Sequence, residues 1–231
     1  MNKNLFEIAY ILDRSGSMQD MVEPAIAGFN QFLNEQREAP GDARLSLVLF
    51  DDQFEVPCDR LPLDEVPELD TTTYVPRATT ALLDAIGRTI NEIDQKLQGM
   101  LEAERPGKVM VAIFTDGLEN ASREFSLDRI NDLIRDKREN HGWEFLFLAA
   151  NQDAIATAGR MGIDPNMSGT VKFSKAGVHS SSSSMSRKMH AMRNYSVSAQ
   201  KSADFDAPMQ DIAFEEEIIV KKKRKKDDQD S

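Results

Sequence analysis

Residues 5–18 read LFEIAYILDRSGSM, a mostly apolar run that ends abruptly in an acidic and serine-rich turn. A short apolar run of this kind is typical of a strand that is covered on both faces of a sheet. Three further runs have the same character, at residues 45–50, 109–114 and 145–150. Together they predict the central strands of a buried sheet.

Helical patterns lie between these runs. Apolar residues recur at helical spacing across residues 22–33, 82–97, 127–134 and 154–161, and Ser126 stands where it can cap the third of these helices. Strands that alternate with helices of this length form βαβ units. We therefore predict an α/β fold with a doubly wound, mainly parallel, Rossmann-like sheet and helices on both faces.

One stretch breaks the alternation. Residues 54–63 follow the run at residues 45–50 after only Asp51, Asp52 and Gln53, a spacing that indicates a hairpin. The prolines in residues 54–63 favour an edge position, because proline cannot donate to a sheet ladder. We expect one antiparallel edge strand here.

The later part of the chain contains one more strand and one more helix. Residues 169–173 suit a last strand, and Met185, Met189 and Met192 recur at a spacing that predicts a core-facing helix. The serine run at residues 180–184 is either the polar beginning of that helix or a loop before it.

The apolar pattern stops at about residue 196. Residues 221–226 are all basic and an acidic end follows. A segment with few apolar residues cannot offset roughly 1–2 kcal/mol of backbone entropy per residue. We therefore predict one domain over residues 1–195 and a disordered charged tail over residues 196–231.

Composition narrows the functional classes. The net charge of -11 argues against a general affinity for nucleic acid or for anionic membranes. The single cysteine, Cys58, excludes an internal disulfide framework and fits a reducing compartment. The first residues have the pattern of a strand instead of a signal peptide, and no apolar run approaches the ~20 residues that span a bilayer. We expect a cytoplasmic protein.

Oxygen-bearing side chains follow two of the predicted strands. Asp13 ends the first strand, and Ser15 and Ser17 follow it in a tight turn; Asp116 follows the strand at residues 109–114. Ligands of open parallel sheets bind beyond the carboxyl ends of the strands. Thr80, which opens the predicted helix at residues 82–97, adds a hydroxyl.

This set of side chains predicts the kind of metal. Carboxylate and hydroxyl oxygens suit Mg²⁺, Mn²⁺ or Ca²⁺ and not zinc or copper. His141, His179 and His190 are scattered along the chain, so they predict neither a metal cluster nor a catalytic base. Because hydroxyls are neutral, a metal held in this way stays electrophilic and can take a carboxylate from outside.

The pattern Asp-x-Ser-x-Ser over residues 13–17, a threonine that opens a helix, and Thr-Asp-Gly over residues 115–117 resembles the metal-ion-dependent adhesion site of von Willebrand factor A domains, in their intracellular bacterial form. The resemblance covers about residues 4–195. In the family, the serines and the threonine contact the metal directly or through water, two aspartates complete the shell, and an acidic side chain of the ligand fills the open position. The resemblance therefore implies Mg²⁺, or alternatively Mn²⁺ or Ca²⁺, held by the five side chains Asp13, Ser15, Ser17, Thr80 and Asp116.

The sequence departs from the family at the threonine loop. The family usually has a glycine shortly before its threonine, whereas residues 76–80 here read PRATT. Thr80 is the expected ligand because residues 81–86 match the start of the family's helix, and Thr79 is the alternative. The loop without glycine is expected to be stiffer.

The leading functional hypothesis is a metal-dependent module that binds a partner protein presenting Asp or Glu. Family analogy places such a module as an adaptor in a stress, defence or AAA+ ATPase-linked complex. Self-association through the acidic run at residues 215–217 is a further possibility. The rival hypothesis is a Mg²⁺-dependent hydrolase of phosphate esters or nucleotides. The chain lacks a Walker-type glycine loop and a Gly-x-Ser-x-Gly elbow, and no general base stands out, so we expect no catalytic residues and no enzyme.

Four charged residues near the predicted site allow more than one interpretation. Arg14 either steers an acidic ligand or faces solvent. Asp51 and Asp52 fit a hairpin turn better than a second metal ion. Asp84 is expected to complement the dipole of its helix.

Overall fold

The computed structural model describes residues 1–116, 119–150, 154–172 and 174–227. Across these residues a six-stranded sheet runs in the order β3-β2-β1-β4-β5-β6. Its strands are β1 (Asn2–Asp13), β2 (Asp42–Phe50), β3 (Phe54–Pro62), β4 (Pro106–Thr115), β5 (Glu144–Ala149) and β6 (Ser168–Thr170). β3 pairs antiparallel with β2 at one edge, and the other neighbours are parallel. The predicted fold class, with its antiparallel edge strand, is confirmed.

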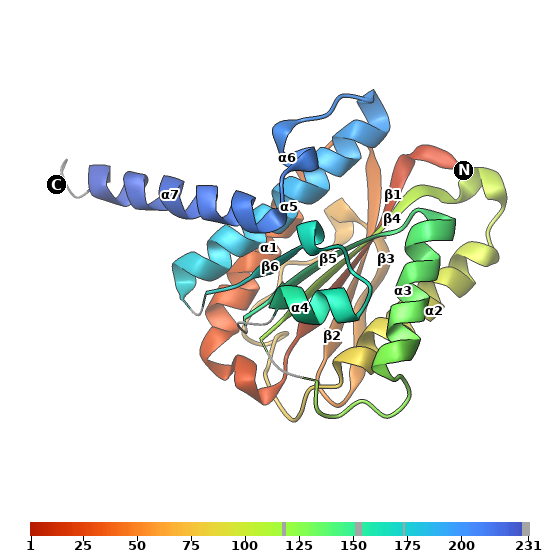
Figure 1. The fold of residues 1–231 in the computed structure, drawn as a ribbon, viewed down its shortest axis with the longest axis horizontal. Coiled ribbons are helices and arrows are strands. Elements are labelled where there is room, and N and C mark those ends of the chain that lie inside the picture. Colours follow the sequence, from red (N-terminus) through yellow and green to blue (C-terminus); the bar gives the residue numbers. More distant parts are fainter. Residues whose placement is uncertain (117–118, 151–153, 173, 228–231) are drawn as a thin grey trace.

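Helices cover both faces of the sheet (Figure 1). One face carries α1 (Val22–Glu38) and α5 (Lys175–Ser198). The other carries α2 (Leu82–Gln98), α3 (Leu127–His141) and α4 (Ala154–Arg160). The Ser126 hydroxyl accepts a hydrogen bond from the Arg129 N–H and so caps α3, as predicted. The chain thus covers one face with its first and last of these helices and the other face with the three between them, so both faces are covered as a doubly wound sheet requires.

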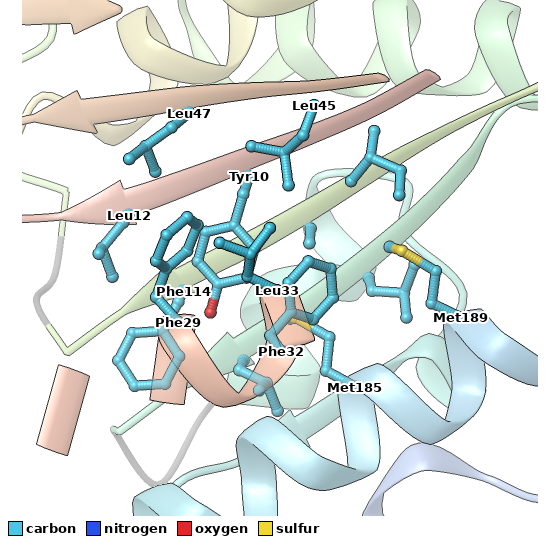
Figure 2. Close-up of a cluster of buried hydrophobic side chains, with 14 of the residues drawn as sticks. Tyr10, Leu12, Phe29, Phe32, Leu33, Leu45, Leu47, Phe114, Met185 and Met189 are labelled. Carbon is cyan, nitrogen blue, oxygen red and sulfur yellow. The ribbon is translucent and has the colours of Figure 1, made fainter. Parts of the chain in front are cut away.

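The alternation of side chains along β1 explains its continuous apolar sequence. Tyr10 and Leu12 point to the layer of α1 and α5, whereas Ala9 and Ile11 point to the layer of α2 and α3. Figure 2 shows Tyr10 among apolar side chains of α1 and, beyond them, methionines of α5. The predicted core role of the methionine stripe is confirmed, since Met185, Met189 and Met192 are all buried there.

The serine run lies inside α5 and is buried against α1. A Cβ atom placed on Gly28 of α1 would lie 2.4 Å from the Ser182 Oγ atom, so the two helices meet where both side chains are small. The run therefore lies in the early turns of the helix, as one of the two predicted alternatives has it, and not in a loop. Small side chains let the backbones of the two helices approach each other closely.

The predicted disordered tail differs from the structure. α5 continues to Ser198, and α6 (Ala203–Asp206) and α7 (Met209–Asp227) follow it, with α7 extending away from the body toward the C-terminus (Figure 1). Met209 and Ile212 are buried at the start of α7, which packs on α5. Residues 228–231 lie outside the described part of the chain.

The physical reason for this difference is the burial of Met209 and Ile212 together with charge pairing. Arg187 of α5 contacts Asp204 and Glu216, each at 2.7 Å, so acidic residues that the sequence analysis assigned to solvent are partners of a folded helix. The sequence analysis counted few apolar residues here, but those at the start of α7 are buried against α5. None of the described helices, α7 included, is long and apolar enough to cross a membrane. The expected last strand is shorter than predicted, and Phe173 lies outside the described residues.

Candidate metal centre

The candidate site lies where the strand order reverses. β1 and β4 are central neighbours in parallel, with Leu12 opposite Phe114. Asp13 is the last residue of β1, and Asp116 follows the last residue of β4. Two carboxylates therefore meet beyond the carboxyl ends of adjacent strands, at the switch point where open α/β sheets bind ligands.

Hydrogen bonds join four of the predicted ligands into one cluster. The Ser15 N–H donates to Asp13 Oδ1 at 2.7 Å, and the Ser17 hydroxyl donates to Asp116 Oδ1 at 2.8 Å. The hydroxyl oxygens of the two serines are 3.0 Å apart. The second oxygen of Asp13 accepts from the Thr115 hydroxyl at 2.5 Å. Asp13, Ser15, Ser17 and Asp116 thus present oxygens within one small volume.

One oxygen in this cluster is left without a partner. Among the described residues, Asp116 Oδ2 is buried and accepts no hydrogen bond. Burial raises the pKa of Asp116, and the hydrogen bond from Ser17 opposes that change. A buried carboxylate oxygen that lacks a donor is costly unless something else satisfies it.

Burial also raises the pKa of Asp13, the other carboxylate of the cluster. Burial raises the pKa of Asp13 from 3.8 to about 6, the hydrogen bonds from Thr115 and Ser15 oppose the change, and the charge of Asp116 adds to it. The donors at both carboxyl groups are neutral hydroxyl and backbone groups wherever the structure describes them. Two buried carboxyl groups in such surroundings form an arrangement that a bound cation would stabilise.

Thr80 approaches the cluster from the next loop. The Ala78 carbonyl accepts a hydrogen bond of 3.1 Å from Gly16 N–H, which places the threonine loop beside the two serines. Thr80 is buried, whereas Thr79 is exposed. The Thr80 N–H donates to Asn120 Oδ1 at 3.0 Å, so its backbone is fixed from the far side as well.

Arg14 has neither of the roles expected of it. Its guanidinium is buried and lies 2.8 Å from Glu55 Oε2 and 3.2 Å from Asp51 Oδ2. Asp51 is also buried, and its Oδ1 accepts from Gln53 N–H at 2.6 Å, which is the hairpin role predicted for it. Asp52 is exposed.

Asp84 does more than complement a helix dipole. Its two carboxylate oxygens accept hydrogen bonds of 2.8 to 2.9 Å from three consecutive backbone N–H groups, those of Arg123, Glu124 and Phe125. Asp84 therefore holds residues 123–125, shortly before α3 begins. Sequence reasoning missed this role because the partners lie about 40 residues away.

Other supporting residues were also missed. Thr115 stands beside Asp116 in the motif, so its hydrogen bond to Asp13 had a sequence signal. Tyr74, whose hydroxyl donates to the Asp13 carbonyl at 2.5 Å, and Asn120 had none, since 61 positions separate Tyr74 from Asp13 and 40 separate Asn120 from Thr80. Gly117, the last residue of the predicted motif, lies outside the described residues.

Hydroxyl oxygens make up much of the set of side chains that could hold a metal ion here. Within the described residues, no group of three or more His, Cys, Asp or Glu side chains is arranged to hold a metal ion. The cluster offers two carboxylates and the hydroxyls of serine and threonine instead. Such hard oxygen donors fit Mg²⁺, Mn²⁺ or Ca²⁺.

Comparison with known proteins finds similarity in fold and not in sequence. No protein-family model and no curated protein matches the chain. A von Willebrand factor type A structure from Catenulispora acidiphila matches with a TM-score of 0.56 and 14% identity, over 80% of this chain and 42% of that one. Proximal thread matrix protein 1 from the mussel byssus, with a zinc-occupied MIDAS motif, matches with a TM-score of 0.57 and 14% identity, over 80% and 46% of the two chains.

A third structure, the manganese-loaded TRAP protein of Plasmodium vivax, matches with a TM-score of 0.54 and 15% identity, over 77% of this chain and 72% of that one. The chain spans less than half the length of the first two structures. These likenesses show that the chain has the von Willebrand factor A fold, as its sequence pattern predicts.

Proposed function

We propose that this chain is a metal-dependent protein-binding module. In this proposal Asp13, Ser15, Ser17, Thr80 and Asp116 hold one divalent cation, and the cation takes an Asp or Glu side chain of a partner protein. The observation that carries the proposal is the buried Asp116 Oδ2 atom, which has no donor in the described residues and stands beside two serine hydroxyls.

The chemistry of the five side chains supports this role. When bound, the cation supplies a Lewis-acidic position that an external carboxylate can fill. The Ser17 hydroxyl is oriented by its hydrogen bond to Asp116 Oδ1, and the Ser15 hydroxyl lies 3.0 Å from the Ser17 hydroxyl. Neither serine contributes a charge of its own. The burial of Thr80, against the exposure of Thr79, favours Thr80 as the third hydroxyl.

Mg²⁺ is the cation we propose, with Mn²⁺ or Ca²⁺ as alternatives. Hard oxygen donors favour these ions over softer metals. The neighbours in fold carry zinc in the mussel protein and manganese in the Plasmodium protein. Their metals support a divalent cation in this chain without selecting one.

The proposed partner is a protein, in a cytoplasmic adaptor complex of the stress, defence or AAA+ ATPase-linked kind. The free cysteine Cys58 is buried and burial raises its pKa, which suits a structural thiol in a reducing compartment. Self-association is a narrower version of the proposal. All three glutamates of that acidic run are ion-paired, Glu215 and Glu216 with Arg187 and Glu217 with Lys172, and Glu215 is the most exposed of them at 64%.

Metal binding is tested by titrating Mn²⁺ into the protein and following its electron paramagnetic resonance signal. We expect one site in the wild-type protein, and loss of that site in Asp116→Asn and Ser17→Ala. Asp52→Asn, which removes an exposed charge nearby, is the matched control. Equal Mn²⁺ affinity in all four proteins would contradict the proposal.

Partner binding is tested by capture from cell lysate with Mg²⁺ and with EDTA. Capture should need Mg²⁺ and should disappear in Asp116→Asn but not in Asp52→Asn. We propose a binding module and not an enzyme, so the same preparations should not turn over phosphate esters or nucleotides. Metal-dependent turnover that is lost in Asp116→Asn would favour the hydrolase instead.

A further inference from the structure

The loop that carries Thr80 holds an unusual backbone conformation. Ala78 has φ of 55°, in the left-handed region that glycine enters freely and alanine does not. Ala78 nevertheless fixes this loop to the metal-site turn, because its carbonyl accepts the Gly16 N–H. Something outside the loop must therefore hold it in place.

Four charged side chains can do so, three around the loop and one, Arg77, within it; we call them the arginine clasp: Arg14, Asp51, Glu55 and Arg77. Arg77 Nε lies 2.6 Å from Asp51 Oδ2, and an Arg77 terminal nitrogen lies 2.6 Å from Glu55 Oε1. Arg14 contacts the same two carboxylates from the metal-site turn, at 3.2 Å and 2.7 Å. The clasp thus ties the turn that follows Asp13 to the residue directly before Ala78.

Asp51 is the centre of the clasp. Its side chain is fully buried, and a single oxygen, Oδ2, faces both arginines. Its carbonyl accepts a hydrogen bond of 2.9 Å from Ala81 N–H. Asp51 therefore holds the chain on both sides of Thr80, through the Arg77 side chain before it and through the Ala81 backbone after it.

We propose that Asp51 is a positioning residue of the metal centre, which sets the place of the Thr80 hydroxyl relative to Ser15 and Ser17. The inference rests on the proposed function. A glycine in this loop would adopt the left-handed conformation without help. Because the residue is Ala78, the charged side chains of the clasp must hold that conformation in place. Asp51 itself stays outside the cluster of ligands.

The first test compares Asp51→Asn with Asp52→Asn by Mn²⁺ titration, using the full chain. Removal of a residue that orients a metal ligand typically weakens metal binding about 10- to 100-fold. We expect a loss of that size in Asp51→Asn and none in Asp52→Asn, whose side chain is exposed. Unchanged affinity in Asp51→Asn would overturn this inference while leaving the proposed function intact, whereas a wild-type protein that binds no Mn²⁺ would overturn both.

The second test asks whether Asp51 acts through Thr80. In a double-mutant cycle, Asp51→Asn should weaken Mn²⁺ binding in the wild-type background and have little further effect in Thr80→Ala. Ala78→Gly should recover part of the affinity lost in Asp51→Asn, because glycine keeps the left-handed conformation without the clasp. Equal losses in both backgrounds, or no recovery with Ala78→Gly, would mean that Asp51 acts elsewhere.

Two further measurements guard against a variant that merely misfolds. Arg77 is 45% exposed, so Arg77→Gln spares the core and should weaken Mn²⁺ binding in the same direction as Asp51→Asn. In EDTA, the amide hydrogens of Gly16 and Ala81 should exchange faster in Asp51→Asn than in Asp52→Asn, since both bonds depend on the clasp. Wild-type affinity in Arg77→Gln together with unchanged exchange in Asp51→Asn would refute the clasp.

Discussion

The charge of Asp13 should make the stability of the metal-free protein depend on pH. Asp13 is fully buried, and its pKa rises from 3.8 to about 6 chiefly through burial. A carboxyl group with a raised pKa in the folded state stabilises the fold while it is protonated, and this contribution is lost as the pH rises through the folded-state value. The free energy of unfolding in EDTA should therefore fall between about pH 4 and pH 7.

The size of the effect follows from the shift. Each pKa unit corresponds to about 1.4 kcal/mol, so a shift of about two units gives about 3 kcal/mol over the whole interval. Of this change in the free energy of unfolding, roughly 2 kcal/mol falls between about pH 4.5 and pH 7.5. For a chain of this length that is a change in Tm of about 4–8 °C.

Asp13→Asn is the perturbation that isolates this contribution. The substitution removes the titrating group, and it also changes the hydrogen bonds to Ser15 and Thr115 by an amount that does not depend on pH. Urea unfolding of both proteins in EDTA at the two pH values gives, for each protein, the change in the free energy of unfolding between them. We expect the wild-type protein to lose about 2 kcal/mol more than Asp13→Asn between these values.

Saturating Mg²⁺ provides the complementary measurement. At a concentration about 100-fold above the Kd, it should stabilise the wild-type protein by about 2.7 kcal/mol at neutral pH and leave Asp13→Asn unchanged. Parallel pH profiles for the two proteins in EDTA would refute the reasoning about Asp13. Equal stabilisation of both proteins by Mg²⁺ would show that Asp13 does not bind the metal.

Three further predictions concern the scaffold. Asp84→Ala leaves three backbone N–H groups without their acceptor, and we expect a loss of about 2–3 kcal/mol in thermal or urea unfolding. Gly28→Leu forces a side chain into the contact between α1 and α5 and should cost at least about 2 kcal/mol, with the exposed substitution Asp52→Asn as a neutral reference. Truncation after Ser198 removes the buried Met209 and Ile212, so it should destabilise the protein by about 3–6 kcal/mol while leaving Mn²⁺ affinity unchanged; an unchanged melt would restore the view of a dispensable tail.

The sequence by itself determined the elements and the local half of the site. Every side chain from Ile8 to Asp13 is buried, since the sheet is covered on both faces, and such burial requires a continuous apolar run that can be read directly. Ser15 and Ser17 lie so close to Asp13 in the chain that any strand-to-turn geometry keeps the three together. These features depend on neighbours in sequence, which periodicity and spacing report.

The sequence also indicated the threonine loop, but not what holds it. The prediction of a stiff loop without glycine rested on one missing residue. That Ala78 takes a left-handed conformation, and that Asp51 and Arg77 lie beside it, depends on the hairpin of β2 and β3 meeting the turn after β1. No spacing rule relates residues that come from three separate loops.

Only the tertiary structure joined the two halves of the site. The bond from Ser17 to Asp116 spans 99 positions of the chain, and it forms because β1 and β4 are neighbours in a strand order that many sequences of the same pattern could arrange otherwise. The same holds for α7, whose acidic residues appear solvated in sequence and are ion-paired with α5 in the fold. Charge pairs and strand order are long-range choices, made by the free energy of the whole packed chain and not by any segment of it.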